Sequence, residues 1–250
     1  MGIIIRSTEE IEIMRQAGRI VAAILDVLKR SLEPGMATEE LDAMAVCELN
    51  RYGATSSFKG YLGFPAHLCV SVNEELVHGI PGKRVLCEGD IVSLDFAAMV
   101  DGFHGDAAVT VGVGQISSQA EALLEATEGA LMAGIASANN GAHLSNISSA
   151  IQGFVESRGF SVVREYVGHG IGRKMHEEPQ ILNYGPPGQG PLLREGMTLA
   201  LEPMANVGEW RTKVSGDRWT VTTADGGLCA HSEHTIAITD DEPEILTALD

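Results

Sequence analysis

Apolar residues recur at helical spacing in the first part of the chain and predict a helix over residues 7–30. Ser7 and Glu10 form a capping-box pattern where this helix begins. A second helix is expected over residues 38–53. Strand patterns follow at residues 68–72, 91–99 and 103–113. The first part of the chain is therefore expected to run from helices to strands.

The rest of the chain repeats this order without an evident sequence repeat. Helices come first and strands after them, at residues 117–138, 145–157, 161–167, 197–204, 219–223 and 234–238. A Pro/Gly-rich stretch occurs around residues 185–188, and there is no low-complexity linker. The order predicts one α+β domain over residues 1–250, with pseudo-symmetric halves at about 1–115 and 116–250.

Composition and charge narrow the classes of function. The chain has 250 residues, of which 44% are hydrophobic, and its net charge of −17 gives no general electrostatic footprint for nucleic acid or anionic lipid. No apolar run approaches the roughly 20 residues of a membrane span. The first residues do not form a secretory signal, and the 4 cysteines include no CxxC pair. Free thiols in a reducing cytoplasm are therefore expected.

Two carboxylates stand out in the hairpin that Asp101-Gly102 predicts. If the turn centres there, residue 97 faces Asp106, and Asp95 shares their face of the sheet. The two carboxylates are then diagonal neighbours about 7 Å apart. A buried carboxylate binds a cation, pairs with a base or stays protonated. The alternative is that one of the two faces solvent.

Three later polar residues occupy unusual settings. His169 stands among glycines, Glu202 ends an apolar stretch, and Glu233 begins another. Taken singly, each residue can be explained by an ordinary structural or solvent-exposed role. Together with the hairpin they make four carboxylates and one imidazole, a set of the right size for two divalent ions. Oxygen ligands without a thiolate favour Mn, Fe or Co over a structural zinc.

Further histidines are candidate donors to a substrate. His78 is followed by glycine, and His176 comes seven residues after His169. The His176 segment is not an HExxH zinc helix, because Gln180 stands where the second histidine belongs. His104, two residues before Asp106, has no assigned role.

Six segments resemble the bacterial type I methionine aminopeptidases over nearly the whole chain. They are residues 72–81, Asp101–Asp106, Gly168–Gly172, His176–Pro179, Glu202–Met204 and Glu233–Thr235. The resemblance implies the pita-bread α+β fold, in which two pseudo-symmetric halves surround a curved antiparallel sheet.

The resemblance also implies a ligand set and a substrate pocket. Two divalent ions would be held by Asp95, Asp106, His169, Glu202 and Glu233, with Asp106 and Glu233 bridging them. His78 and His176 would contact the substrate, and Glu202 would shuttle the proton. The methionine pocket would be lined by Tyr61, Phe64, Cys69, Met175 and Trp219, with Phe58 near its entrance. Phe58 and Met175 depart from the enteric enzymes of the family, which have cysteine and phenylalanine there.

The expected activity is hydrolytic removal of the initiator methionine, with a small second residue preferred. The family further implies a monomer that acts on nascent polypeptides near the ribosome, although the acidic sequence shows no basic patch for that contact. No DNA or membrane partner is expected. The alternatives are an Xaa-Pro dipeptidase or aminopeptidase of the same fold, a non-catalytic binding module, and more remotely a two-metal phosphoesterase.

Overall fold

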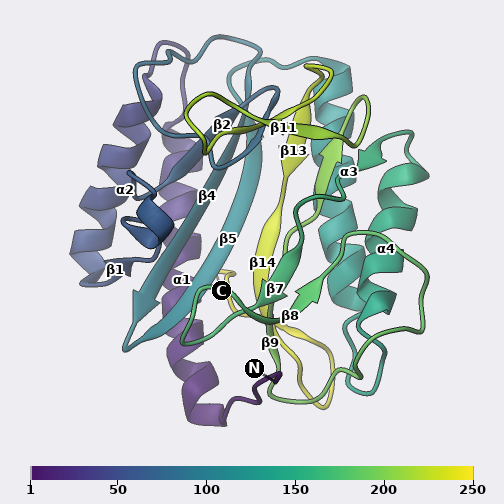
Figure 1. Ribbon diagram of the computed structural model, residues 1–250. Helices are drawn as coiled ribbons and strands as arrows, with labels where there is room; N and C mark the ends of the chain where they lie inside the picture. Colours follow the sequence, from purple (N-terminus) through teal and green to yellow (C-terminus); the bar gives the residue numbers. More distant parts are fainter. Residues whose placement is uncertain (1, 250) are drawn as a thin grey trace.

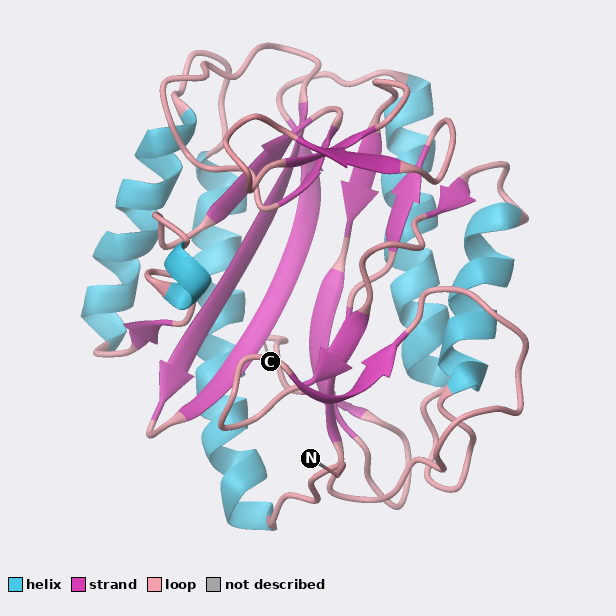
Figure 2. Ribbon diagram, viewed as in Figure 1, coloured by secondary structure: helices cyan, strands magenta, loops and turns pink. Residues whose placement is uncertain are grey.

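A curved antiparallel sheet carries helices on one face in the computed structural model, which describes residues 2–249 (Figures 1 and 2). The helical elements are α1 (Thr8–Ser31), α2 (Thr38–Tyr52), η1 (Tyr61–Gly63, a 3-10 turn), α3 (Ser118–Ala136) and α4 (Ser145–Glu156). Helix α1 lies against β4 and β5, and α3 against strands of the second half. The two halves therefore cover the sheet in the same manner.

The main sheet has 9 strands in the order β1-β4-β5-β14-β9-β7-β8, with β2 beside β4 and β15 beside β14. Its strands are β1 (Thr55–Ser56), β2 (Cys69–Val72), β4 (Ile91–Val100), β5 (Phe103–Gly112), β7 (Gly168–Gly170), β8 (Glu177–Ile181), β9 (Thr198–Leu201), β14 (Glu233–Ala237) and β15 (Glu244–Ile245). The halves meet where β5 pairs with β14. This arrangement confirms the expected α+β fold.

Two smaller antiparallel sheets complete the fold. One has the order β13-β10-β6 and the other β11-β12-β3. Their strands are β3 (Glu75–Val77), β6 (Ser161–Val162), β10 (Met204–Asn206), β11 (Thr212–Val214), β12 (Val221–Thr223) and β13 (Cys229–His231).

The start of the chain folds as its local pattern predicts. Ser7 caps α1, its hydroxyl accepts from Glu10 N at 3.3 Å, and the Glu10 carboxylate accepts from Ser7 N at 3.2 Å. Helix α1 then packs closely on β5, because Gly105 leaves room: a Cβ there would lie 2.8 Å from Gly18 N. This contact fixes the helix next to the strand that carries Asp106.

Two strand predictions are wrong in their extent. The strand expected over 161–167 ends at Val162, because the chain then leaves the small sheet and enters the main sheet as β7. The strand expected over 197–204 breaks after Leu201, and β10 begins at Met204 in a different sheet. Pro203 lies in this break and has no N–H for a continuous ladder.

The packing of β4 decides on which face of the sheet Asp95 lies. Leu94, Phe96 and Ala98 belong to an apolar core that includes residues of α1 and α2, such as Val21 and Leu41. Side chains alternate along a strand, so Asp95 points to the opposite face. A second core in the other half packs α3 and α4 against their strands. Between residues 2 and 249, no helix has the length and apolar character needed to cross a membrane.

Candidate metal centre

Asp95 and Asp106 lie on the sheet face opposite the helices. In the register of β4 and β5, Ala97 pairs with Asp106, and Asp95 pairs with Ala108. The two carboxylates are therefore diagonal neighbours on one face, as the hairpin signal predicts. Both side chains are buried, at 8% and 3% exposure. The alternative in which one of them faces solvent is wrong.

His169 sits in the middle of β7, where it pairs with Ala200 of β9. Gly170 allows this close packing, since a Cβ there would lie 2.2 Å from Glu178 O. The Nδ1–H of His169 donates to Gly170 O at 3.0 Å, because a carbonyl oxygen only accepts. Burial lowers the pKa of His169 to about 3. A neutral ring with its hydrogen on Nδ1 leaves the Nε2 lone pair available for a cation.

Glu202 and Glu233 come from neighbouring strands of the second half. Glu202 directly follows β9 and Glu233 begins β14, and the two strands pair through Leu201 and His234. Glu202 Oε1 lies 3.6 Å from His169 Nε2. The break after β9 thus places the Glu202 carboxylate beside His169.

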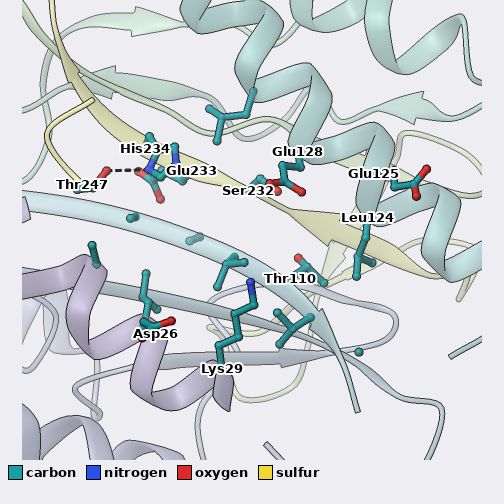
Figure 3. A pocket seen from close by; sticks show the side chains of 18 residues that line it. Asp26, Lys29, Thr110, Leu124, Glu125, Glu128, Ser232, Glu233, His234 and Thr247 are labelled. Carbon is teal, nitrogen blue, oxygen red and sulfur yellow. Dashed lines mark hydrogen bonds between the residues drawn. The ribbon is translucent and has the colours of Figure 1, made fainter. Parts of the chain in front are cut away.

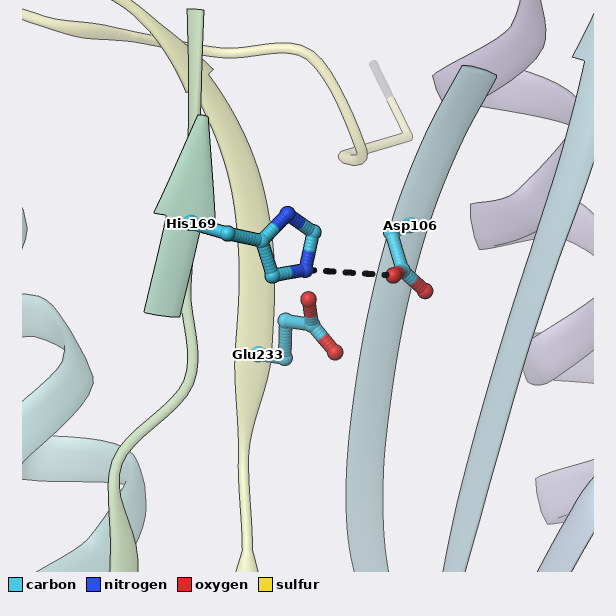
Figure 4. A group of neighbouring side chains, drawn as sticks. All are labelled: Asp106, His169 and Glu233. Carbon is cyan, nitrogen blue, oxygen red and sulfur yellow. Dashed lines mark ion pairs between the residues drawn. The ribbon is translucent and has the colours of Figure 1, made fainter. Parts of the chain in front are cut away.

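One ligand atom each from Asp106, His169 and Glu233 lie within 4.8 Å of one another (Figure 4). The dashed line in that view joins His169 Nε2 and Asp106 Oδ2, which are 4.0 Å apart. Two ligand atoms that each lie about 2.0–2.2 Å from a common ion are at most about 4.4 Å apart, and the His169–Asp106 distance of 4.0 Å meets this limit. Three strands that are far apart in the sequence therefore converge on one point.

The buried carboxyl groups of this cluster would be stabilised by bound cations. Burial raises the pKa of four carboxyl groups above their usual range, namely those of Asp95, Asp106, Glu202 and Glu233. Repulsion from neighbouring carboxylates adds to the rise for Asp106 and Glu233. Within residues 2–249, buried oxygens of Asp95, Asp106 and Glu233 have no hydrogen-bond partner. Divalent cations would satisfy these oxygens and neutralise the charge, so the residues present fit a metal centre.

A cavity of about 380 Å³ opens from this cluster. Every site residue expected from the sequence lines it: Phe58, Tyr61, Phe64, Cys69, His78, Asp95, Asp106, His169, Met175, His176, Glu202, Trp219 and Glu233. The structure thus brings the expected ligands and the expected pocket residues to one place. Their individual roles stay predictions.

One part of the cavity wall is apolar and aromatic. Phe64 meets Trp219 edge to face with ring centroids 5.1 Å apart, and Phe58 meets Phe64 at 6.3 Å. Cys69 is buried and pairs with Asp95 across β2 and β4. The apolar wall therefore begins directly beside the carboxylates.

Two histidines border the cavity with their rings held by aromatic neighbours. His176 Nδ1 lies 2.8 Å from the Tyr61 hydroxyl, and its ring centroid lies 4.2 Å from that of His169. His78 has a left-handed backbone with φ of 60°, and its ring packs edge-on against Tyr166 and Trp219. Burial lowers the pKa of His78 to about 4, so this ring is neutral at neutral pH.

Sequence reasoning missed three residues at this site. Leu62 lines the cavity although it is 81% exposed, Tyr166 packs on His78, and His231 lies beside the carboxylates. Leu62 and Tyr166 carry no chemical signal in the sequence, whereas a second histidine beside Glu233 could have been noticed. His104, left unassigned, has its Nδ1 2.8 Å from Ser57 Oγ and is not among the residues lining this cavity.

A second cavity, of about 570 Å³, lies behind β5 and β14 between α1 and α3 (Figure 3). Asp26 and Lys29 of α1 and Glu125 and Glu128 of α3 line it. Glu233 also lines this cavity, so it borders both sides of the sheet. Among residues 2–249, the cluster of buried ligand atoms that contains Glu233 also includes Asp106 and His169, which line the first cavity and not this one.

Residues 12–240 match the family model described as metallopeptidase family M24. The chain belongs to this family. It is 56% identical over 245 residues to methionine aminopeptidase 1 of Bacillus subtilis, covering 98% of this chain and 99% of that protein. It is 52% identical to a methionine aminopeptidase of Clostridium perfringens, covering 99% of each. Membership in this metallopeptidase family implies the use of divalent metal, in agreement with the cluster.

Solved structures agree with the fold. A crystal structure of methionine aminopeptidase from Thermotoga maritima is 46% identical, with a TM-score of 0.98, and covers 99% of this chain and 100% of that chain. Prolidase from Pyrococcus furiosus is 22% identical with a TM-score of 0.81, and the match covers 99% of this chain and 66% of the prolidase. The second likeness shows the fold alone. The pita-bread arrangement expected from the sequence is confirmed.

Proposed function

We propose that this chain removes the N-terminal methionine from polypeptides by hydrolysis. The observation that carries the proposal is that a buried carboxylate–histidine cluster and an apolar aromatic wall share one cavity. The full-length similarity to methionine aminopeptidases supports it. An exposed apolar side chain of a substrate would pack on the wall while its backbone reaches the carboxylates.

We assign the cluster as the site of two divalent ions of the Mn, Fe or Co type. Asp95, Asp106, His169, Glu202 and Glu233 would hold them. The donor set supports this choice because it is rich in carboxylate oxygens, contains one imidazole and lacks a thiolate ligand. When bound, such ions supply an acidified water as nucleophile and Lewis acidity toward the scissile carbonyl.

The side chains of the cavity would then move protons and bind the substrate. Glu202 would accept the proton of the attacking water and deliver it to the leaving amine. The Tyr61 hydroxyl donating to His176 Nδ1 would leave the hydrogen of that ring on Nε2. This N–H would donate to the carbonyl oxygen as it becomes negative. His78, neutral and half-buried, would contact the substrate backbone.

The apolar wall would select the first residue. Phe64, Cys69, Met175 and Trp219 line a surface that suits an unbranched, polarisable thioether. His78 and Phe58 border the same cavity and would restrict the second residue to a small side chain. The substrates would be the N-termini of new polypeptides. A monomer, contact with the ribosome and a cytoplasmic location stay predictions.

A substrate panel tests the proposal. Metal-loaded protein should hydrolyse Met-Ala-Ser with Mn²⁺ or Co²⁺ and should leave Ala-Pro and an aryl phosphate ester uncut. Preferential cleavage of Ala-Pro would instead identify an Xaa-Pro peptidase, whose fold this chain shares. Cleavage of none of the three, with metal bound, would favour a binding module.

A further inference from the structure

His231 is a buried histidine beside the metal centre to which the reaction assigns no role. It ends β13 and is 1% exposed. Within residues 2–249, neither of its ring nitrogens has a hydrogen-bond partner. A buried polar group without a partner costs free energy, so its position calls for an explanation.

The carboxylates of the metal centre are the acceptors nearest to this ring. His231 Nε2 lies 3.8 Å from Glu233 Oε2 and 3.9 Å from Glu202 Oε2. These distances are too long for hydrogen bonds, but a shift of less than 1 Å would close either one. Glu202 stands between two imidazoles, because its Oε1 lies 3.6 Å from His169 Nε2. Each oxygen of Glu202 therefore faces a different histidine.

The backbone that carries this ring is anchored to the hairpin. His231 N donates to Thr110 Oγ1 at 2.9 Å, and the Thr110 hydroxyl donates to His231 O at 2.7 Å. The Ser93 hydroxyl donates to the same Thr110 oxygen at 2.8 Å, since the threonine hydrogen is already used. Thr110 pairs with Ser93 in the register of β4 and β5, the strands that carry Asp95 and Asp106. The backbone that carries the ring is thus held at a fixed place relative to the strands of Asp95 and Asp106.

The carboxylates beside the His231 ring determine which hydrogen bonds the ring can make. Ionised carboxylates only accept hydrogen bonds, so the ring must present an N–H toward them. We propose that His231 is a positioning residue of the metal centre, whose Nε2–H donates to the carboxylates of Glu202 and Glu233 and orients both toward the cations. Such outer contacts set the direction of ligand oxygens and typically change metal affinity 10- to 100-fold.

His231 differs from His169, the histidine among the five proposed ligands, in the hydrogen bonds of its ring. His169 offers a free Nε2 lone pair, because Gly170 O takes its Nδ1–H. No comparable acceptor takes a hydrogen from His231 in the described part of the chain, which leaves its N–H for the carboxylates. The inference rests on the proposed ligand set, and it does not depend on the identity of the substrate.

Metal binding measured directly tests this role. Protein stripped with a chelator would be titrated with Mn²⁺ by calorimetry, for the wild type and for His231→Leu, His231→Gln and His67→Leu. The leucine variant should bind Mn²⁺ about 10- to 100-fold more weakly, because it has no N–H to donate. The glutamine variant should stay within about threefold of the wild type, because its amide also donates.

His67→Leu is the matched control. His67 is half-buried, its Nδ1 also lacks a hydrogen-bond partner among the described residues, and it does not line the cavity. This variant should bind Mn²⁺ as the wild type does. Circular dichroism and melting of the metal-free proteins would show that all variants fold. The visible spectrum of bound Co²⁺ should be the same in the wild type and in His231→Gln, because the ligands are unchanged.

Two results would overturn the inference. Wild-type affinity in His231→Leu would remove any positioning role. A loss in His231→Gln as large as in His231→Leu, with an altered Co²⁺ spectrum, would make His231 a ligand rather than a donor. Failure of the wild type itself to bind Mn²⁺ or Co²⁺ would instead reject the proposed ligand set, and with it the proposed function.

Discussion

Tyr61 and His176, 115 residues apart in the sequence, are joined across the cavity by a hydrogen bond of 2.8 Å between the tyrosine hydroxyl and Nδ1. Their rings also stack, with centroids 5.4 Å apart and an interplanar angle of 26°. A hydroxyl that donates to Nδ1 leaves the ring hydrogen on Nε2. The proposed role of His176 uses its Nε2–H, and this role requires that the Tyr61 hydroxyl donates to Nδ1.

Tyr61→Phe should lower kcat for Met-Ala-Ser roughly 2- to 10-fold, the value of one hydrogen bond. The ring remains to stack on His176, so KM and metal content should change little. Steady-state kinetics with elemental analysis would check this. An unchanged kcat would show that the hydroxyl does not orient His176 during the reaction.

His176→Ala should reduce kcat by about 10²–10³-fold, the usual cost of one oxyanion donor, while metal content stays intact. Glu202→Gln should lose activity and also bind one ion more weakly, because Glu202 is proposed as both ligand and proton carrier. Activity and metal content would be measured on the same preparations. A metal-free His176→Ala protein would contradict this division of roles.

Removal of metal should lower the melting temperature. A ligand that binds only the native state stabilises it, by about 2.7 kcal/mol at a free concentration of 100 times its Kd. Melting curves with excess Mn²⁺ and with excess chelator should therefore differ. His176→Ala should keep this difference and Glu233→Gln should lose most of it. Superimposable curves for the wild type would count against the metal centre.

The Glu233 carboxyl should make metal-free protein less stable as the pH rises from acid to neutral. Burial, together with neighbouring carboxylates, raises the pKa of Glu233 above its ordinary value of 4.5. Below 4.5 the group is protonated in both the folded and the unfolded states. As the pH rises above 4.5, the unfolded state releases its proton first, so stability falls until the raised folded pKa is passed.

A variant comparison isolates this effect from the rest of the titration. Between about pH 5 and about pH 8, the melting temperature of metal-free wild type should fall relative to that of metal-free Glu233→Gln. Glu121→Gln, which removes an exposed carboxylate, should behave like the wild type. Equal pH dependence in Glu233→Gln and the wild type would mean that Glu233 carries no burial penalty.

The peptide series Met-X-Ser should show fast cleavage for X of Gly, Ala or Ser and slow cleavage for Leu or Arg. The first residue should be selected by the apolar wall, and norleucine should be cut within about 10- to 200-fold of methionine, the limit of an apolar pocket. A charged side chain at the first position would lose its hydration in the apolar pocket without gaining a polar partner, so such substrates should be rejected. Rates for Met-Arg-Ser or Leu-Gly-Ser equal to that for Met-Gly-Ser would reject the assigned specificity.

Local sequence determined the parts of the site that lie close together in the chain. The capping box predicts where α1 begins, and Asp101-Gly102 predicts a hairpin whose register makes Asp95 and Asp106 diagonal neighbours. These predictions succeed because a capping box and a tight turn depend on a few adjacent residues. The candidate ligands could likewise be singled out, because carboxylates and a histidine beside apolar strands occupy unusual settings, and the family could be proposed from the resemblance of six segments.

Only the tertiary structure decided how the remote segments meet. It shows that β7, β9 and β14 bring His169, Glu202 and Glu233 together, and that the chain changes sheets at Pro203, where a continuous strand was expected. It also shows that the ring nitrogens of His231 have no hydrogen-bond partner among residues 2–249, and that the ring lies near two carboxylates. Local patterns do not encode pairing between strands far apart in the chain, because that pairing depends on which faces the whole molecule buries.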